Sequence, residues 1–193
     1  MTSQPTPSSA ELFLRSLAPT GTALEQTQTI QRVEDLAAEN QLESSRVTVT
    51  GRGVVHEDCY LSTAVGKTLV ERLDAIERWT KHNEATVPGI TTKTVDPSPV
   101  HQQPYTVTTV PNVLLLEYEG ASLQFVSPAT VEGEHVSVSD HLDAISEETS
   151  RNPIGAEVRG VTVSYREATP DQHEPAEPSD SPIMVPLDAE DTY

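Results

Sequence analysis

The stretch that most constrains the fold runs from residue 105 to residue 126 and is the densest apolar run in the chain. It contains an uninterrupted apolar block at 113–116, which is typical of a strand buried on both faces of a sheet. Glu119 and Gly120 indicate a turn, after which residues 123–126 return as a second strand. We therefore expect a hairpin at the centre of a sheet.

Other segments alternate between apolar and polar residues and are predicted to be strands. Residues 11–17 place Leu12 and Leu14 on one face, and residues 46–55 carry valines in a similar pattern. Gly51 and Gly53 interrupt the second segment, which indicates a bulge or a close approach of two backbones. Weaker patterns predict an edge strand at 90–95 and one more strand at 158–165.

Two helices are marked by their capping residues. The helix at 23–40 begins with a capping box formed by Thr22 and Glu25. A short last helix begins at Ser137 or Ser139, after a turn-rich segment.

The clearest helix pattern runs from Ser62 or Thr63 to residue 82. Its apolar residues recur at helical spacing, so one side of this helix is expected to face the core. The expected buried stripe consists of Val65, Leu69, Leu73, Ile76 and Trp79, with Val70 beside it.

These patterns predict one domain with tails. The α/β domain covers residues 10–150 and follows a disordered N-terminus at 1–9. An extra strand lies within 151–166. Residues 167–193 hold eight acids, five prolines and no lysine or arginine, which is typical of a disordered acidic tail.

The charge is strongly acidic, with 30 acids against 12 bases and a formal net charge of −18. Lysine appears only at Lys67, Lys81 and Lys93. Such a surface suits concentrated salt, because salt screens the repulsion between like charges. No run of bases indicates nucleic-acid binding, and no segment resembles a secretion signal or a membrane span. We expect a cytoplasmic protein of a salt-adapted organism.

Few residues indicate chemistry. His56, Glu57, Asp58 and Cys59 are four metal-ligand types in one loop, but adjacent residues rarely all reach one ion. The acidic neighbours of Cys59 also favour its thiol form over a nucleophilic thiolate. We interpret this segment as an exposed loop and expect no catalytic, cofactor or metal site.

Three further features have simple structural interpretations. Gly51, Arg52 and Gly53 could hold an anion but lack a phosphate-binding motif, so a turn or bulge is expected. The turn at 19–22 could bind an anion at a helix N-terminus, although a capped turn is the simpler interpretation. His141 lies between two aspartates in sequence and is expected on a solvated helix face.

The order strand, helix, strand, helix, hairpin, helix resembles the thioredoxin-like fold over residues 11–148. The turn at 19–22 stands where thioredoxins keep their CxxC motif, and Val110 with Pro111 stands where they keep a cis-proline. Cys59 is the only cysteine, so the resemblance implies a scaffold without redox chemistry. A ferredoxin-like α+β sandwich is the alternative fold.

The segments LFLRSLAP, YTVTTVPNVLLLEYEGASLQFVSP and SVSDHLDAI resemble a group of short acidic haloarchaeal proteins described as helix-turn-helix domain proteins. The resemblance implies transcriptional regulation. A helix-turn-helix needs two helices joined by a short turn, whereas the first two helices predicted here are separated by a strand. If DNA is bound, the expected contacts on the helix at 62–82 are Lys67, Arg72, Arg78 and Lys81.

The sequence therefore favours a non-enzymatic binding or regulatory protein that associates with a protein partner or with itself. One alternative is a helix-turn-helix DNA-binding regulator, which would need a local basic patch. The other is an enzyme that uses the loop from His56 to Cys59, which would need a second polar cluster in a cleft.

Overall fold

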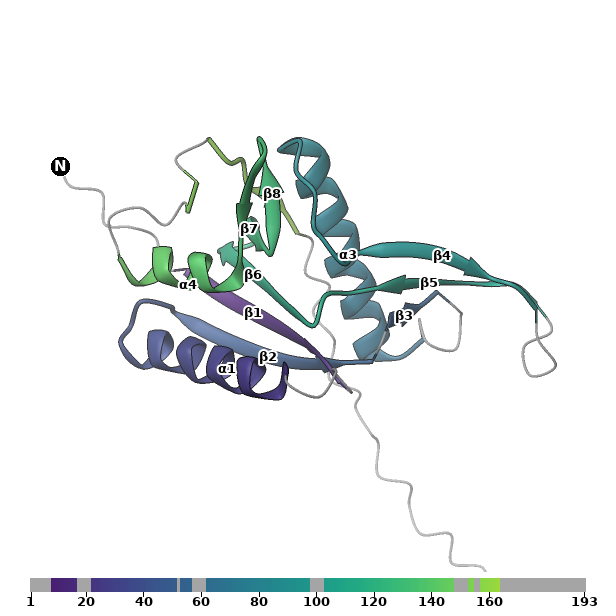
Figure 1. The fold of residues 1–193 in the computed structure, drawn as a ribbon, viewed down its shortest axis with the longest axis horizontal. Helices are drawn as coiled ribbons and strands as arrows, with labels where there is room; N and C mark the ends of the chain where they lie inside the picture. Colours follow the sequence, from purple (N-terminus) through teal and green to yellow (C-terminus); the bar gives the residue numbers. More distant parts are fainter. Residues whose placement is uncertain are drawn as a thin grey trace, which may run out of the picture.

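The computed structural model describes residues 8–16, 22–51, 53–56, 62–97, 103–147, 153–154 and 157–163. It confirms the predicted α/β class, with helices packed on a mixed sheet (Figure 1). The main sheet has five strands in the order β10-β7-β6-β1-β2. These strands are β1 (Ser8–Arg15), β2 (Ser44–Thr50), β6 (Val113–Glu119), β7 (Ser122–Ser127) and β10 (Val161–Thr162).

The predicted hairpin is confirmed as β6 and β7, and the apolar block lies in a fully enclosed part of the sheet. β1 lies between β6, with which it is antiparallel, and β2, with which it is parallel. Leu115 and Leu116 of β6 are fully buried, as expected of a strand that is covered on both faces.

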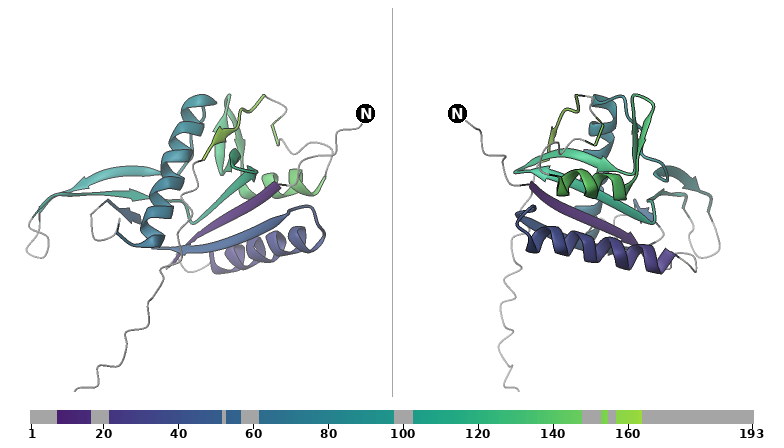
Figure 2. Two further views of the ribbon diagram at one scale, coloured as in Figure 1. Left: turned by 180° about the vertical axis from the view of Figure 1, so that it is seen from behind. Right: turned by 60° about the vertical axis from the view of Figure 1, so that its left-hand side comes forward.

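Helices cover both faces of this sheet. On one face, Leu12 of β1 packs in a core with α1 (Thr22–Ala38) and α4 (Val138–Ser146). On the other face, Phe13 packs in a core with α3 (Ala64–His82). Successive side chains of a strand point to opposite faces, so β1 contributes to both cores. Figure 2 shows α1 and α3 on opposite sides of β1.

The caps predicted for two helices are confirmed. Thr63 caps α3 by accepting a hydrogen bond from the backbone N–H of Gly66. Ser137 caps α4 in a reciprocal capping box with Asp140. Each cap satisfies backbone donors that the first turn of a helix leaves unpaired.

The predicted apolar stripe of α3 is wrong at its first position. Val65 is 57% exposed, whereas Arg72 is buried with Leu69, Ile76 and Trp79. Val65 lies in the first turn of α3, before the part of the helix that packs over the sheet. Tertiary contacts therefore decide which side of the first turn is buried.

The glycine-interrupted segment forms two strands that belong to different sheets. After β2 ends at Thr50, β3 (Gly53–Val55) joins a separate three-stranded sheet of order β3-β5-β4. A Cβ added to Gly53 would lie 2.9 Å from the backbone oxygen of Thr108, so the predicted close backbone approach is confirmed. β4 is Thr91–Val95, which confirms the predicted edge strand, and β5 is Tyr105–Thr109.

The other predicted segments are the turn-rich region after the hairpin, the late strand, the bond at Val110–Pro111 and the two ends. The turn-rich segment contains a small hairpin of β8 (Ala129–Val131) and β9 (Glu134–Val136), and the predicted late strand is present as β10. The bond between Val110 and Pro111 is trans, whereas Ser127–Pro128 is cis. Of the predicted disordered ends, residues 1–7 and 167–193 lie outside the described residues, as does the turn at 19–21, whereas Ser8 and Ser9 belong to β1 and were wrongly placed in the disordered N-terminus.

Candidate nucleic-acid interface

The helix expected to contact DNA, α3, is mainly a core helix. The guanidinium of Arg72 donates to both carboxylate oxygens of Glu11 on β1, at 2.6 and 2.9 Å. Tyr118 also donates its hydroxyl hydrogen to Glu11, at 3.2 Å, and its ring lies 5.6 Å from the guanidinium carbon of Arg72. Arg72 is only 4% exposed, so the structure removes it from the predicted DNA contacts.

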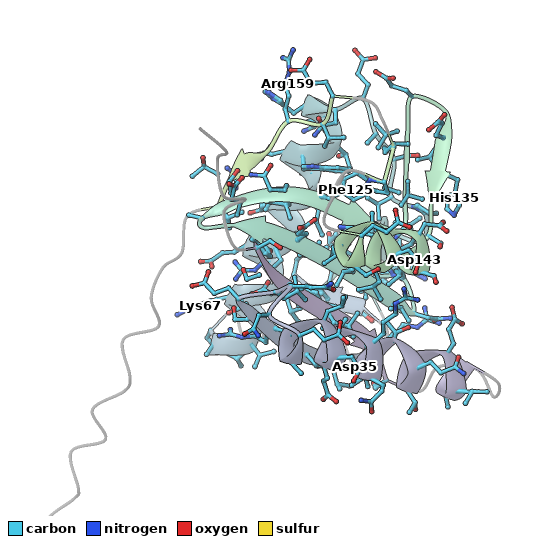
Figure 3. All side chains as sticks on the ribbon, turned by 90° about the vertical axis from the view of Figure 1, so that its left-hand side faces the viewer. Asp35, Lys67, Phe125, His135, Asp143 and Arg159 are labelled. Carbon is cyan, nitrogen blue, oxygen red and sulfur yellow. The ribbon has the colours of Figure 1, made fainter. Side chains whose placement is uncertain are left out.

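The other predicted contacts on α3 lie on a face of mixed charge. Lys81 pairs with Glu77 at 2.6 Å, and this pairing lowers the pKa of the Glu77 carboxyl. Arg78 donates to the backbone oxygen of Thr162 at 3.2 Å. Lys67 is exposed and forms no ion pair with another described residue (Figure 3). This face therefore offers no continuous positive surface.

The described helices also lack the arrangement that gives a helix-turn-helix its name. α1 and α3 are separated by β2 and β3, and α4 follows six further strands. Within the described ranges, no two helices are joined by the 3–4-residue turn of that motif.

A different element has the charge and shape of a nucleic-acid contact. β4 and β5 form a ribbon, here named the arm, which extends beyond α3 and away from the main sheet (Figures 1 and 2). From residue 85 to residue 116 the sequence contains a single acid, Asp96, although the chain holds 30 acids in 193 residues. β4 and β5 themselves contain no acid, and Asp96 directly follows β4.

The two faces of the arm differ. Thr92 pairs with Thr108 in register, and this face lies toward α3, because Thr108 is next to the fully buried Val54 of β3. The opposite face carries Lys93, paired in register with Val107, and neighbouring threonine hydroxyls. Lys93 is exposed. The outer face therefore combines a cation with hydroxyl groups and has no carboxylate.

Residues of the suspected metal or nucleophile loop are described only at His56. Its ring nitrogen Nε2 lies 2.9 Å from the hydroxyl oxygen of Thr108. A hydrogen bond therefore joins His56 to the root of the arm, which is the end where β3 pairs with β5. Glu57, Asp58 and Cys59 lie outside the described residues, as does Arg52. Among the residues that are described, no three His, Cys, Asp or Glu side chains converge as metal ligands.

A buried polar cluster was not anticipated from the sequence. His141 of α4 lies between Ser127 and Glu117, with Nδ1 2.9 Å from the serine oxygen and Nε2 3.0 Å from the carboxylate. His141 is fully buried, so its predicted place on a solvated face is wrong. Phe125 packs against the His141 ring at 4.8 Å between centroids.

This cluster has the residue types of a hydrolase triad but not its access. Ser127 and His141 have no exposed surface and Glu117 is 3% exposed, so no substrate reaches the serine. The cluster instead joins α4 to β6 and β7 through paired polar groups, because burial without partners would be unfavourable.

The sequence contains a pattern from which the arm could have been found, whereas no sequence pattern indicates the buried cluster. The long acid-poor interval is visible between Glu84 and Glu117, but it predicts an interface only once the ribbon is seen to project from the body. Glu117, Ser127 and His141 are far apart in sequence, and only the fold brings them together.

Comparison with family models matches residues 2–150 to a family described as a helix-turn-helix domain. No curated protein and no solved structure matches the chain. The thioredoxin-like arrangement therefore stays a prediction. None of the described helices is long and apolar enough to cross a membrane.

Proposed function

Because the chain belongs to the helix-turn-helix domain family, we propose that it is a DNA-binding transcriptional regulator. The family match favours this function over the protein-binding scaffold that the sequence alone suggests. The proposal requires a surface that a polyanion can approach, although the whole chain has a net charge of −18.

We propose that the arm is this surface. A two-stranded ribbon fits the major groove of DNA, which is about 12 Å wide. β3 pairs with β5 at residues 107–109, so the part of the arm that would enter the groove lies beyond Val107, where only β4 and β5 are paired. The single observation that carries the proposal is the near absence of acids along this projecting ribbon.

The outer face of the arm has suitable groups for contacts with DNA. Phosphates accept hydrogen bonds from lysine, threonine and tyrosine side chains. Lys93 supplies the positive charge, while Thr91 and Thr109 hold each other across the ribbon at 2.6 Å between their hydroxyl oxygens. Such a pair presents hydroxyl groups in a fixed position.

The mixed-charge face of α3 is a weaker candidate. Asp74 and Glu77 lie on the same helix as Lys67 and would repel phosphates. The burial of Arg72 leaves no arginine near the middle of this helix for base contacts. We therefore place the interface on a ribbon rather than on a recognition helix.

The acidic excess suits a cytoplasm rich in salt, and we propose that binding takes place there. High salt shortens the range of the repulsion between the acidic body and DNA to a few ångströms, since the Debye length at 1 M is about 3 Å. A local contact through the arm is then possible even though the rest of the surface is negative.

A genomic capture experiment tests the function. The full chain is incubated with sheared genomic DNA of its source in molar KCl, crosslinked, and recovered for sequencing. We expect discrete enriched fragments that are lost with Lys93→Glu and retained with Lys67→Glu, the matched change on α3. A flat DNA profile, together with one reproducible protein partner, would favour the scaffold function instead.

A further inference from the structure

A cleft of about 500 Å³ lies between α3 and the root of the arm. α3 forms one wall, and the sheet of β3, β5 and β4 forms the other. Small-molecule sites in proteins commonly have volumes of about 300–1,000 Å³. The cleft is therefore large enough for a ligand with one or two rings.

Its inner surface is apolar. Leu73 and Ile76 of α3 face Val87 and Ile90 from the segment that connects α3 to β4. Ile76 and Val87 belong to the buried core, and Leu73 and Ile90 pack against it. A flat apolar group would thus find a rigid surface, because these side chains are already held by the core.

Fixed polar groups line the wall formed by the sheet. The hydroxyl of Thr108 lies 2.9 Å from the His56 ring and 2.9 Å from the hydroxyl of Thr92. Thr108 is only 5% exposed, so this short chain of hydrogen bonds has a defined geometry. It can orient a polar group of a ligand, as a few fixed polar groups do in many apolar pockets.

The wall formed by α3 is negative. Asp74 and Glu77 both border the cleft and lie one helical turn apart. Glu77 is paired with Lys81, whereas the Asp74 carboxylate forms no ion pair with any described residue. Asp74 is therefore the group best placed to attract a positive charge.

We infer that this cleft binds a small organic cation, an amine attached to an apolar ring system. The ring system lies against Leu73, Ile76 and Ile90, and the ammonium group pairs with Asp74. Charge complementarity selects the cation, since the lining contains two carboxylates and no lysine or arginine. This site is independent of DNA binding, although Thr92 and Thr108 place it at the root of the arm.

Three probes that share one indole ring test the charge preference. Tryptamine is a cation, tryptophol is neutral, and indole-3-acetate is an anion. Their binding to the full chain is measured by titration calorimetry, without DNA, at the lowest KCl concentration that keeps the protein folded. We expect tryptamine to bind roughly fivefold more tightly than tryptophol, and indole-3-acetate to bind least.

Two variants of α3 test the location. Asp74→Asn should bring the affinity for tryptamine down to that for tryptophol, while Glu71→Gln, an equal loss of charge outside the cleft, should leave it unchanged. Binding that ignores the charge of the probe, equal effects of the two variants, or no binding of any probe would overturn the inference. Because DNA is absent, none of these results depends on the proposed regulatory function.

Discussion

Arg72 of α3 and Glu11 of β1 form a bidentate ion pair that is enclosed between the helix and the main sheet. The side chains are 5% and 11% exposed, so water does not solvate either charge well. The pair fixes α3 against the strand that contributes to both cores. A buried pair of this kind determines which residue of a helix faces inward, and removal of one partner leaves the other charge without compensation.

The first prediction concerns this pair. Arg72→Met leaves the Glu11 carboxylate buried without its partner, and we expect the free energy of unfolding to fall by about 3–5 kcal/mol. The double variant Glu11→Leu with Arg72→Met should recover most of this loss. Urea unfolding in molar KCl, followed by the fluorescence of Trp79, measures both.

The matched control is Lys81→Met, which breaks the exposed pair with Glu77. Exposed pairs contribute little, so a small change is expected. If Arg72→Met were as mild as this control, the buried pair would not have the role assigned to it.

The second prediction concerns the enclosed cluster around His141. A fluorophosphonate probe should leave Ser127 of the native protein unlabelled, because the serine has no exposed surface. His141→Ala should lower the free energy of unfolding by roughly 3 kcal/mol, since Glu117 then lacks a partner. Ser127→Ala should cost about 1 kcal/mol. Rapid labelling of Ser127, detected by mass spectrometry, would show that the site opens to substrates.

The third prediction uses the cap of α4. The Ser137 side chain, followed by its backbone N–H, lowers the pKa of the Asp140 carboxyl below its ordinary value. Because the pKa of Asp140 is lower in the folded protein than in the unfolded chain, its ionised carboxylate stabilises the fold. This contribution is complete at pH values above the pKa in the unfolded chain, about 3.9, and is lost as the pH falls through the pKa in the folded protein. Carbon NMR of the side-chain carboxyl should therefore show Asp140 titrating below its ordinary range.

Ser137→Ala should shift the Asp140 titration upward, toward its ordinary pKa, and weaken the start of α4. The capping box should stabilise the protein by roughly 0.5 kcal/mol at neutral pH, since solvent screens the exposed carboxylate. An unchanged titration of Asp140 in this variant would contradict the hydrogen bonds at the cap.

The fourth prediction concerns the electrostatics of the arm. Each phosphate contact contributes about 0.9 to the slope of log affinity against log salt concentration. Lys93→Ala should therefore reduce that slope by about 1 for each arm that contacts DNA, while Lys67→Ala leaves it unchanged. Fluorescence anisotropy with a captured fragment, over a series of KCl concentrations, gives both slopes. The reverse result would place the contact on α3.

Local sequence patterns predicted the elements well wherever neighbouring residues determine them. The block at 113–116 predicted a buried strand. Each of the two pairs of cap candidates, Ser62 or Thr63 and Ser137 or Ser139, included the residue that caps its helix. The same patterns failed where contacts with residues distant in sequence determine which side chains are buried. Arg72 is buried because Glu11 of β1 pairs with it. The periodicity of a helix cannot predict a contact with a distant strand.

The candidate site shows the same division. The acid-poor interval is present in the sequence, but the separation of β4 and β5 from the main sheet depends on Gly53, whose close approach to β5 starts a second sheet. The basic residues of α3 were predicted to contact DNA because their spacing in the sequence does not show which of them are buried. The fold moves the candidate interface from that helix to the arm.

Site-specific photocrosslinking to a captured DNA fragment tests the central claim most directly. Benzoylphenylalanine is placed at Val95, which shares the outer face of the arm with Lys93, in one variant and at Lys67 on α3 in another. The account predicts a DNA adduct from position 95 and none from position 67. An adduct from position 67 alone would contradict it and return the interface to the helix.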